Sequence, residues 1–292
     1  MTVTKQTNSK LTRRLTIGLI LILAGILLSV VSYLHHKFPR STDGWIGLSS
    51  GVFYKSWEIS EYQMRDPQVM SLKLHLKNTK TKIVHRSFSS GSSSKITSFR
   101  LTYADQLIRQ NTDFVALINS ARYQIEKFKR NLPGALVLPH ESVLVNGVLS
   151  HQHKHSYLIW WTEDGDVHVE TTKPPPYPLP KGAWMGVGVQ GLQVQNGKPA
   201  YNTLDSLPQA YPRSFIGVDP ENDIVWLIAF EKITGRAMID EVVAMGIPWG
   251  GQLDSGDSTQ MILGKGLPGI RPYTGIRNLR PTAGYLAVVR KD

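Results

Sequence analysis

Short apolar runs with the periodicity of β-strands recur along most of the chain. Residues 71–77 read SLKLHLK, in which three leucines alternate with polar residues and therefore fall on one face of a strand. Other strand-like runs, separated by turn-rich segments, begin at Phe114, Tyr157, Val167, Asp223 and Tyr285. Strands and helices do not alternate regularly, so the pattern predicts an α+β domain of mostly antiparallel strands with a few helices.

Two segments are predicted to be helical. The first starts at Thr102, which forms a Thr-x-x-Asp capping box with Asp105, and it runs towards residue 110. The second covers about residues 236–245. It ends before Gly246, a residue suited to the left-handed conformation of a helix C-cap.

One long segment is uniformly apolar. Residues 15–34 read LTIGLILILAGILLSVVSYL, which is about the length that a helix needs to cross a membrane, and four basic residues precede it. We predict a cytoplasmic basic tail at 1–14, one N-terminal transmembrane signal-anchor helix at 15–34, and an exported domain at 35–292, periplasmic or extracellular. The alternatives are a cleaved secretory signal peptide and a buried core helix, which would lack a polar face.

The formal net charge is +11, and its distribution is uneven. Between Pro67 and Ala104 there is no Asp or Glu, whereas seven Lys or Arg residues occur. This segment forms either a face for a polyanion or lipid headgroup or a set of solvated strand and loop side chains, and we favour the second interpretation. Few aromatic residues are interleaved with the basic ones, so no nucleic-acid partner is predicted.

The composition also bears on metals and cofactors. The chain has no Cys, which excludes disulfides, thiolate catalysis and Cys-ligated metals. The run HQHKH at 151–155 would place three imidazoles on one strand face, but successive ligands would lie about 7 Å apart, so a polar strand edge is favoured over a metal site. The GVGVQG run at 186–191 precedes a strand-like segment instead of a helix, which argues against a dinucleotide site. We therefore predict no metal and no cofactor.

The stretch LDSGDSTQM at 253–261 gathers carboxylates and hydroxyls in an otherwise basic chain. It is predicted to be a loop between two apolar strands, with Asp254 ending the first and Asp257 and Ser258 opening the second. Gly256, together with the glycines at 250 and 251, would let a backbone approach a ligand closely and present N–H groups to an anion. A sugar or a phosphate suits such a loop, and the alternative is a tight turn whose Asp and Ser side chains cap its own backbone.

Two other interpretations of this stretch meet specific objections. Asp-Ser-Gly after an apolar residue is similar to the active-site loop of aspartic proteases, in which two such loops share one proton. The chain has no second Asp-Ser/Thr-Gly, so dimerisation would have to supply the partner loop. Ser258 does not lie in a Gly-x-Ser-x-Gly sequence, because Gln260 stands where the second glycine would be, so it is not at a nucleophile elbow.

The order of segments resembles that of the phosphodiester glycosidase domain family. The matching segments are PRSFIGVDPENDIVWLIAFE from 212, GIPWGGQLDSGDSTQMIL from 246 and IRNLRPTAGYLAVV from 276. In that family an Arg-Thr/Ser-x-x-Gly strand, a helix and a Leu-Asp-Gly-Gly-Gly-Ser loop follow in this order, after an earlier Asn-Gly-Gly-Phe-like segment. The positions of this sequence that match are Asn119, Arg213, Gly217, Asp254, Gly256 and Ser258.

The resemblance implies an enzyme that hydrolyses a sugar-1-phosphodiester bond in envelope or extracellular glycans. It implies a catalytic role for Asp254 as nucleophile, base or electrostatic stabiliser, and a phosphate clamp at Arg213. Asn119 and Ser258 would orient sugar hydroxyls, and Gly256 and Asp257 complete the predicted substrate-binding loop. An alternative for the arginine is a structural ion pair with Asp219 or Asp254.

Two departures from the family pattern lead to a second hypothesis. Ser120, Ala121 and Arg122 follow the asparagine where the family has Gly-Gly-Phe, and Ser255 replaces a glycine. Such side chains would narrow the pocket. The second hypothesis is therefore a degenerate domain that binds anionic polysaccharide or sugar phosphates, held to the membrane by its N-terminal helix, without cleaving them.

Overall fold

A computed structural model describes residues 26, 44–57, 69–78, 80–86, 88–90, 98–120, 122–124, 132–150, 157–171, 178–201, 209–277 and 280–291. The chain divides into two compact units, Met1–Ile46 and Gly47–Asp292. Within the described residues, no helix has both the length and the apolar character needed to cross a membrane. The predicted tail at 1–14 and membrane segment at 15–34 lie outside those residues, apart from Ile26, and so does the HQHKH run.

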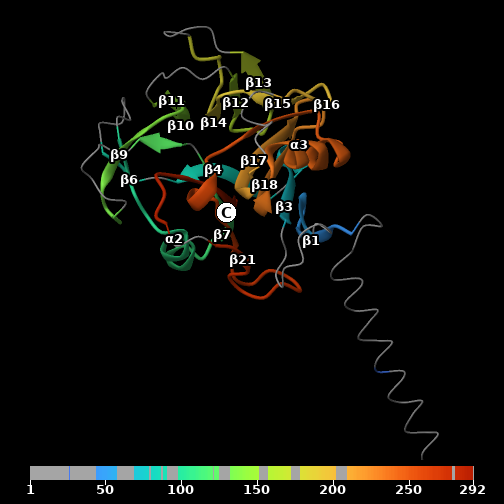
Figure 1. The fold of residues 1–292 in the computed structure, drawn as a ribbon. Coiled ribbons are helices and arrows are strands. Elements are labelled where there is room, and N and C mark those ends of the chain that lie inside the picture. The colour runs from blue at the N-terminus through green and yellow to red at the C-terminus, as the bar shows by residue number, and fades with distance from the viewer. Residues whose placement is uncertain are drawn as a thin grey trace, which may run out of the picture. The chain divides into compact units, whose positions relative to one another are not determined.

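The second unit is built mainly from antiparallel strands, as the hydrophobic pattern predicts (Figure 1). Its largest sheet has the order β1-β2-β3-β18-β17-β19-β15-β16. The bounds are β1 (Ile46–Ser49), β2 (Val52–Trp57), β3 (Val69–His75), β18 (Ile224–Ile233), β17 (Tyr211–Asp219), β19 (Trp249–Gln252), β15 (Leu192–Gln195) and β16 (Lys198–Pro199). A 3-10 turn, η1 (Leu76–Asn78), follows β3.

Two five-stranded sheets and one four-stranded sheet complete the unit. The sheet that carries Asn119 has the order β21 (Gly275–Ile276), β20 (Met261–Leu263), β7 (Phe114–Asn119), β22 (Tyr285–Arg290) and β4 (Thr81–Arg86). The second is β11 (Val148–Leu149), β10 (Val143–Val145), β14 (Met185–Val189), β12 (Tyr157–Trp161) and β13 (Val167–Thr171). The small sheet is β5 (Phe88–Ser90), β6 (Ser98–Arg100), β9 (Leu136–Pro139) and β8 (Tyr123–Gln124).

Two helices lie against these sheets in the described part of the chain (Figure 1). The helix α3 (Gly235–Ala244) contacts β15, β16 and β18, and Thr234 caps its first turn by accepting a hydrogen bond from the backbone N–H of Ala237. Gly246 follows the C-cap with φ of 75°, so the predicted second helix and its left-handed stop are confirmed.

The predicted capping box at the first helix is wrong. The helix α2 (Ala104–Gln110) begins two residues after Thr102, with Tyr103 at its N-cap and no side-chain hydrogen bond at that cap. The backbone of Thr102 instead exchanges two hydrogen bonds with that of Thr282, each 3.0 Å long. This tertiary pairing holds Thr102 in an extended bridge, so its hydroxyl bonds to the carbonyl of Arg100 and not to the helix.

The core lies within and between the sheets. The strand β7 is buried along its whole length because it runs between β20 and β22, and β17 and β18 are buried over most of their lengths. Near-continuous apolar runs are what a strand covered on both faces requires. The polar residues found inside these strands, Asn119, Arg213 and Ser214, are therefore exceptions that need hydrogen-bonding partners.

Candidate active site

Asn119 is the buried polar junction between two sheets and the LDSGDST loop. Its side-chain carbonyl accepts a hydrogen bond from the Ser214 hydroxyl on β17 at 2.6 Å and from the backbone N–H of Gln260 at 2.9 Å. Its amide nitrogen donates to the carbonyl of Asp254 at 2.7 Å. The side chain predicted to orient a sugar thus fixes the loop that carries Asp254.

Arg213 lies behind the same loop and is 1% exposed. Its Nε donates to the carbonyl of Ile233 at 3.0 Å, one Nη donates to Oε1 of Gln252 at 2.8 Å, and its guanidinium lies 3.9 Å from the centroid of the Tyr211 ring. Gln252 in turn donates from Nε2 to the Ser255 hydroxyl at 2.7 Å. The arginine therefore orients a glutamine that holds the loop residue next to Asp254.

The predicted partner carboxylate of Arg213 at the far end of its strand has another role. Asp219 lies at the end of β17, where its carboxylate accepts hydrogen bonds from the backbone N–H groups of Glu221 and Asn222 and from the Asn222 side chain. It stabilises the turn into β18.

The LDSGDST stretch forms the predicted loop between β19 and β20. Gly256 has φ of 72°, and a 3-10 turn, η2 (Gly256–Ser258), begins at this residue. Open space surrounds the position where a Cβ would stand on Gly256, so the backbone conformation, not crowding, requires glycine there. Asp257 is exposed and Ser258 is buried.

The glycines at 250 and 251 serve packing. A Cβ on Gly250 would lie 2.5 Å from the Phe215 ring, and one on Gly251 would lie 2.9 Å from both the carbonyl of Gly191 and the Val189 side chain. The interpretation that they open the backbone to a ligand is therefore wrong for these two residues. Gly186 of the GVGVQG run likewise packs against Ile159 and Trp160 within β14, which confirms a strand there.

Asp254 follows β19 and is half-buried. Burial raises the pKa of its carboxyl group to about 6, and Glu141 acts in the same direction, while a hydrogen bond from Ser258 and the positive charge of Arg122 oppose the rise. The backbone N–H of Ser255 also donates to Oδ1 of Asp254 at 3.0 Å. The carboxyl group therefore changes its charge close to neutral pH, as an acid–base catalyst requires.

Sequence reasoning missed a second carboxyl group near this loop. Glu141 is 4% exposed, and burial raises its pKa, against the opposing charges of Arg122 and His140. It accepts a hydrogen bond from the backbone N–H of Arg122 at 2.8 Å, and its Oε1 lies 3.4 Å from Nδ1 of His140. The Arg122 side chain reaches Oε1 of Gln190 at 2.8 Å. Arg122 is thus held between Glu141 and Gln190.

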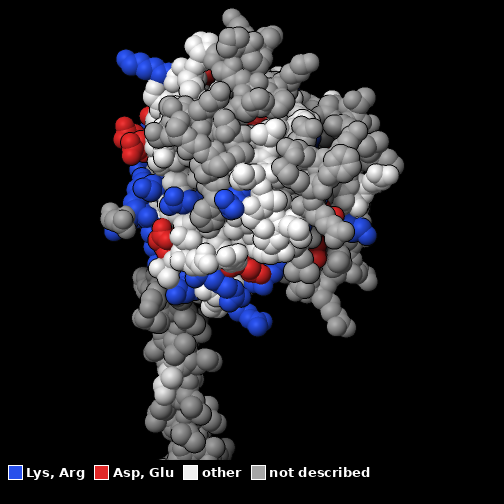
Figure 2. Space-filling view, turned by 90° about the vertical axis from the view of Figure 1, so that its left-hand side faces the viewer, with Lys and Arg blue, Asp and Glu red and all other residues white. Residues whose placement is uncertain are grey.

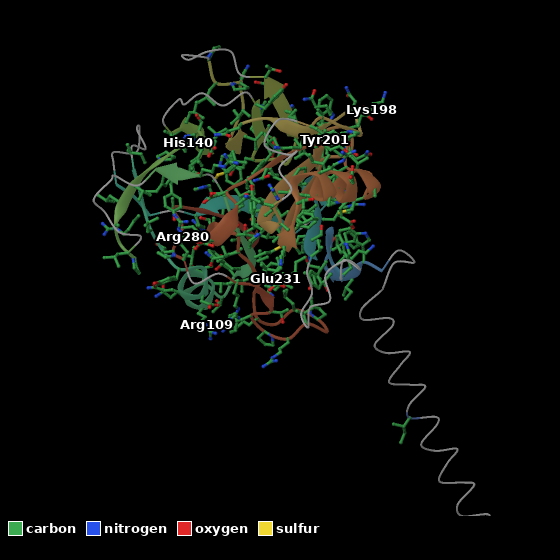
Figure 3. All side chains as sticks on the ribbon, in the orientation of Figure 1. Arg109, His140, Lys198, Tyr201, Glu231 and Arg280 are labelled. Carbon is green, nitrogen blue, oxygen red and sulfur yellow. The ribbon has the colours of Figure 1, made fainter. Side chains whose placement is uncertain are left out.

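Tyr123 and Arg280 lie close to Ser258 as well. The Ser258 hydroxyl lies within hydrogen-bonding reach of Tyr123 as well as Asp254. Burial raises the pKa of the Tyr123 phenol, the nearby Arg280 lowers it and Asp254 raises it. The Arg280 guanidinium lies 5.5 Å from the centroid of the Tyr123 ring, and Figure 3 labels Arg280 and His140 in this region.

Two of the four residues that depart from the family pattern, Ser120 and Ser255, hydrogen-bond to other protein groups. The Ser120 hydroxyl is buried and lies 2.8 Å from Nε2 of His85, whose pKa burial lowers to about 3. The Ser255 hydroxyl bonds to Gln252 and donates to the carbonyl of Leu253 at 3.3 Å. These two side chains are thus engaged by other protein groups, whereas Arg122, a third departure, acts on Asp254 through its positive charge.

The structure therefore brings most of the predicted residues together. Asn119, Gly256 and Ser258 contact or adjoin Asp254, whereas Arg213 is linked to the neighbouring Ser255 through Gln252. The arginines that act electrostatically on Asp254 and Tyr123 are Arg122 and Arg280. Among the described residues, no group of three or more His, Cys, Asp or Glu side chains could hold a metal ion.

The model of the phosphodiester glycosidase family matches residues 112–289, which include every residue of this site except His85. The chain belongs to the phosphodiester glycosidase family. A comparison with curated proteins gave no match.

Two solved structures share the fold of this phosphodiester glycosidase domain. One is a hypothetical protein from Synechocystis, with 15% identity and a TM-score of 0.56 over 82% of this chain and 62% of that one. The chain thus spans less than two thirds of the Synechocystis protein. The other is the catalytic domain of zebrafish N-acetylglucosamine-1-phosphodiester alpha-N-acetylglucosaminidase, auto-inhibited by its pro-peptide, with 10% identity and a TM-score of 0.55 over 87% of this chain and 86% of that one.

Proposed function

We propose that this protein hydrolyses the bond between a sugar and a phosphodiester, with the Asp254 carboxylate at the reacting centre. The observation that carries the proposal is the half-buried Asp254, whose pKa of about 6 leaves it ionised at neutral pH inside a cluster of hydrogen-bond donors. Cleavage at the anomeric carbon passes through an oxocarbenium-like state, which a carboxylate stabilises or attacks.

The arginines beside Asp254 suit the phosphate group of such a substrate. A guanidinium presents a planar fork of donors to two phosphate oxygens. Arg122 is already oriented by Glu141 and Gln190, and Arg280 lies near Tyr123, whose phenol is within reach of Ser258. We assign the phosphate contact to these two arginines and a positioning role to Arg213, which its Gln252 contact favours.

The alternative is a domain that binds anionic glycans and no longer cleaves them. Two of the departures from the family pattern give this alternative little support, because the Ser120 and Ser255 hydroxyls are engaged by His85 and Gln252. We also propose that residues 1–34 anchor the chain and that the domain acts outside the cytoplasm on envelope or extracellular glycans. Protease added to intact cells or spheroplasts should then digest residues 35–292, whereas protection would place the domain in the cytoplasm.

Turnover decides between cleavage and binding. The full chain is incubated with a panel of sugar-1-phosphodiesters, and release of free sugar is compared among the wild type, Asp254→Asn and Asp164→Asn. Asp164 is an exposed carboxylate in a turn and serves as the matched control. Release by the wild type and the control, but not by Asp254→Asn, would establish a glycosidase centred on Asp254. Binding without release by all three proteins would favour the binding domain.

A further inference from the structure

A groove of about 620 Å³ lies between α2, β18 and the segment that leads into β21, and Asp254 does not line it. We call it the arginine groove. The residues of interest in its lining are Arg109, Glu231, Arg271, Tyr273, Thr274 and Arg277. Figure 3 labels two of them, Arg109 from α2 and Glu231 from β18. None of the predicted site residues lines this groove, and the proposed reaction does not use it.

Its positive charges are only partly compensated. Arg277 pairs with the carboxylate of Asp105 at 3.4 Å and donates to the carbonyl of Tyr273. Arg109 and Arg271 are exposed and have no carboxylate partner among the residues that the structure describes. Glu231 supplies the opposing charge on the wall. Three guanidinium groups around one hollow attract anions, because their potentials add.

The turn at residues 271–274 orients one of these guanidinium groups. Its second central residue, Tyr273, has φ of 58°, which is unusual for a bulky side chain, and Thr274 closes the turn by donating from N–H and hydroxyl to the carbonyl of Arg271. In this conformation the Tyr273 ring lies 4.4 Å from the Arg109 guanidinium. Stacking against one face of a guanidinium leaves its N–H edge available to a ligand.

We propose that the arginine groove is a second anion site, which binds a phosphate-bearing ligand through Arg109 and Arg271. Guanidinium groups match phosphate oxygens with two parallel hydrogen bonds, and the volume accommodates a ligand the size of a glycerol or sugar phosphate. Figure 2 shows Lys and Arg side chains gathered at the lower end of the face that carries α2, with few acidic side chains among them. The proposal does not depend on cleavage at Asp254.

Titration calorimetry of the full chain tests the proposal, with glycerol phosphate as a monoester probe and glycerophosphoglycerol as a diester probe. The variants are Arg109→Gln, Arg271→Gln and the double variant. Arg236→Gln is the matched control, since Arg236 is an exposed arginine 5.5 Å from the centroid of the Tyr201 ring on another element. Anion binding near Asp254 is common to all these proteins, so the difference between them reports on the groove alone.

We expect wild type and control to bind equally and each single variant to bind roughly tenfold more weakly, since hydrogen bonds to charged groups are strong. The double variant should lose this binding at unchanged thermal stability. A response to only one probe would identify the ligand as a monoester or a diester. Equal binding by wild type and the double variant, or no binding by the wild type, would overturn the proposal. The sugar-release assay tests Asp254 and the calorimetry tests Arg109 and Arg271. Failure of the proposed glycosidase activity can therefore be distinguished from failure of the proposed anion site.

Discussion

Replacing Asp254 by Asn should make the protein more stable while it abolishes turnover. The folded structure raises the pKa of Asp254 from 3.8 to about 6, mainly because the ionised carboxylate loses water on burial. A shift of this size corresponds to about 3 kcal/mol between the two protonation states. Because the side chain is only half-buried, water screens part of this energy. We therefore expect Asp254→Asn to raise the free energy of unfolding by about 2 kcal/mol at pH 7.

The sign of the effect follows from proton linkage. Because the folded pKa of Asp254 lies above the unfolded value, the folded state binds the proton more tightly than the unfolded chain. The stabilising contribution is therefore fully present below about pH 4 and is lost as the pH rises through about 6. Asn resembles the protonated acid at every pH. The free energy of unfolding of the variant should therefore exceed that of the wild type at pH 7 and equal it near pH 4.

Urea unfolding of both proteins at pH 4 and pH 7 measures this difference, because the free energy of unfolding is linear in denaturant. Asp164→Asn, which removes an exposed carboxylate, should change the free energy of unfolding little at either pH. If Asp254→Asn were equal to or less stable than the wild type at pH 7, burial would not be what raises the pKa of Asp254, and the argument would be refuted.

Four further outcomes are expected. Sugar release should rise about tenfold per pH unit below about pH 6 and level off above it, since the Asp254 carboxylate must be ionised; a falling profile would assign it an acid role instead. Asn119→Ala should lower the free energy of unfolding by about 4 kcal/mol in a urea titration, because three buried hydrogen bonds are lost. Gly250→Ala should cost about 2 kcal/mol in the same titration, because its methyl group would collide with the Phe215 ring. Arg213→Lys should lower kcat more than it raises KM, since it disturbs a positioning contact. A change in KM alone would instead favour a direct contact between Arg213 and the phosphate.

Much of the fold could be read from local patterns. The runs beginning at 114, 157, 167, 223 and 285 all form strands, because alternation or continuity of apolar residues decides which faces are buried. The second helix and its glycine stop were likewise predictable, because a capping threonine and a left-handed glycine act within one turn of the chain. The start of the first helix could not be predicted in this way, because Thr102 pairs with the distant Thr282 and does not cap the helix.

The loop itself was predictable as a loop, but its surroundings were not. Arg122 and Arg280 stand 158 positions apart in the sequence, and the sheet pairing of β7 with β20 and β22 brings their segments together. Glu141 gave no motif at all. What marks Glu141 as a site residue is its burial beside Arg122, and that arrangement exists only in the folded chain.

By itself, the sequence determined the strand-rich domain, the position of the Asp254 loop and the family resemblance, because these depend on residue types and their spacing along the chain. Tertiary structure alone decided the roles of the polar residues. Arg213 and Asn119 became supports for the loop because their buried donors and acceptors had to be satisfied by protein groups. Asp254 acquired a pKa near neutrality because the folded chain buries its carboxyl group and places Glu141 and Arg122 close to it, a property that no single segment carries.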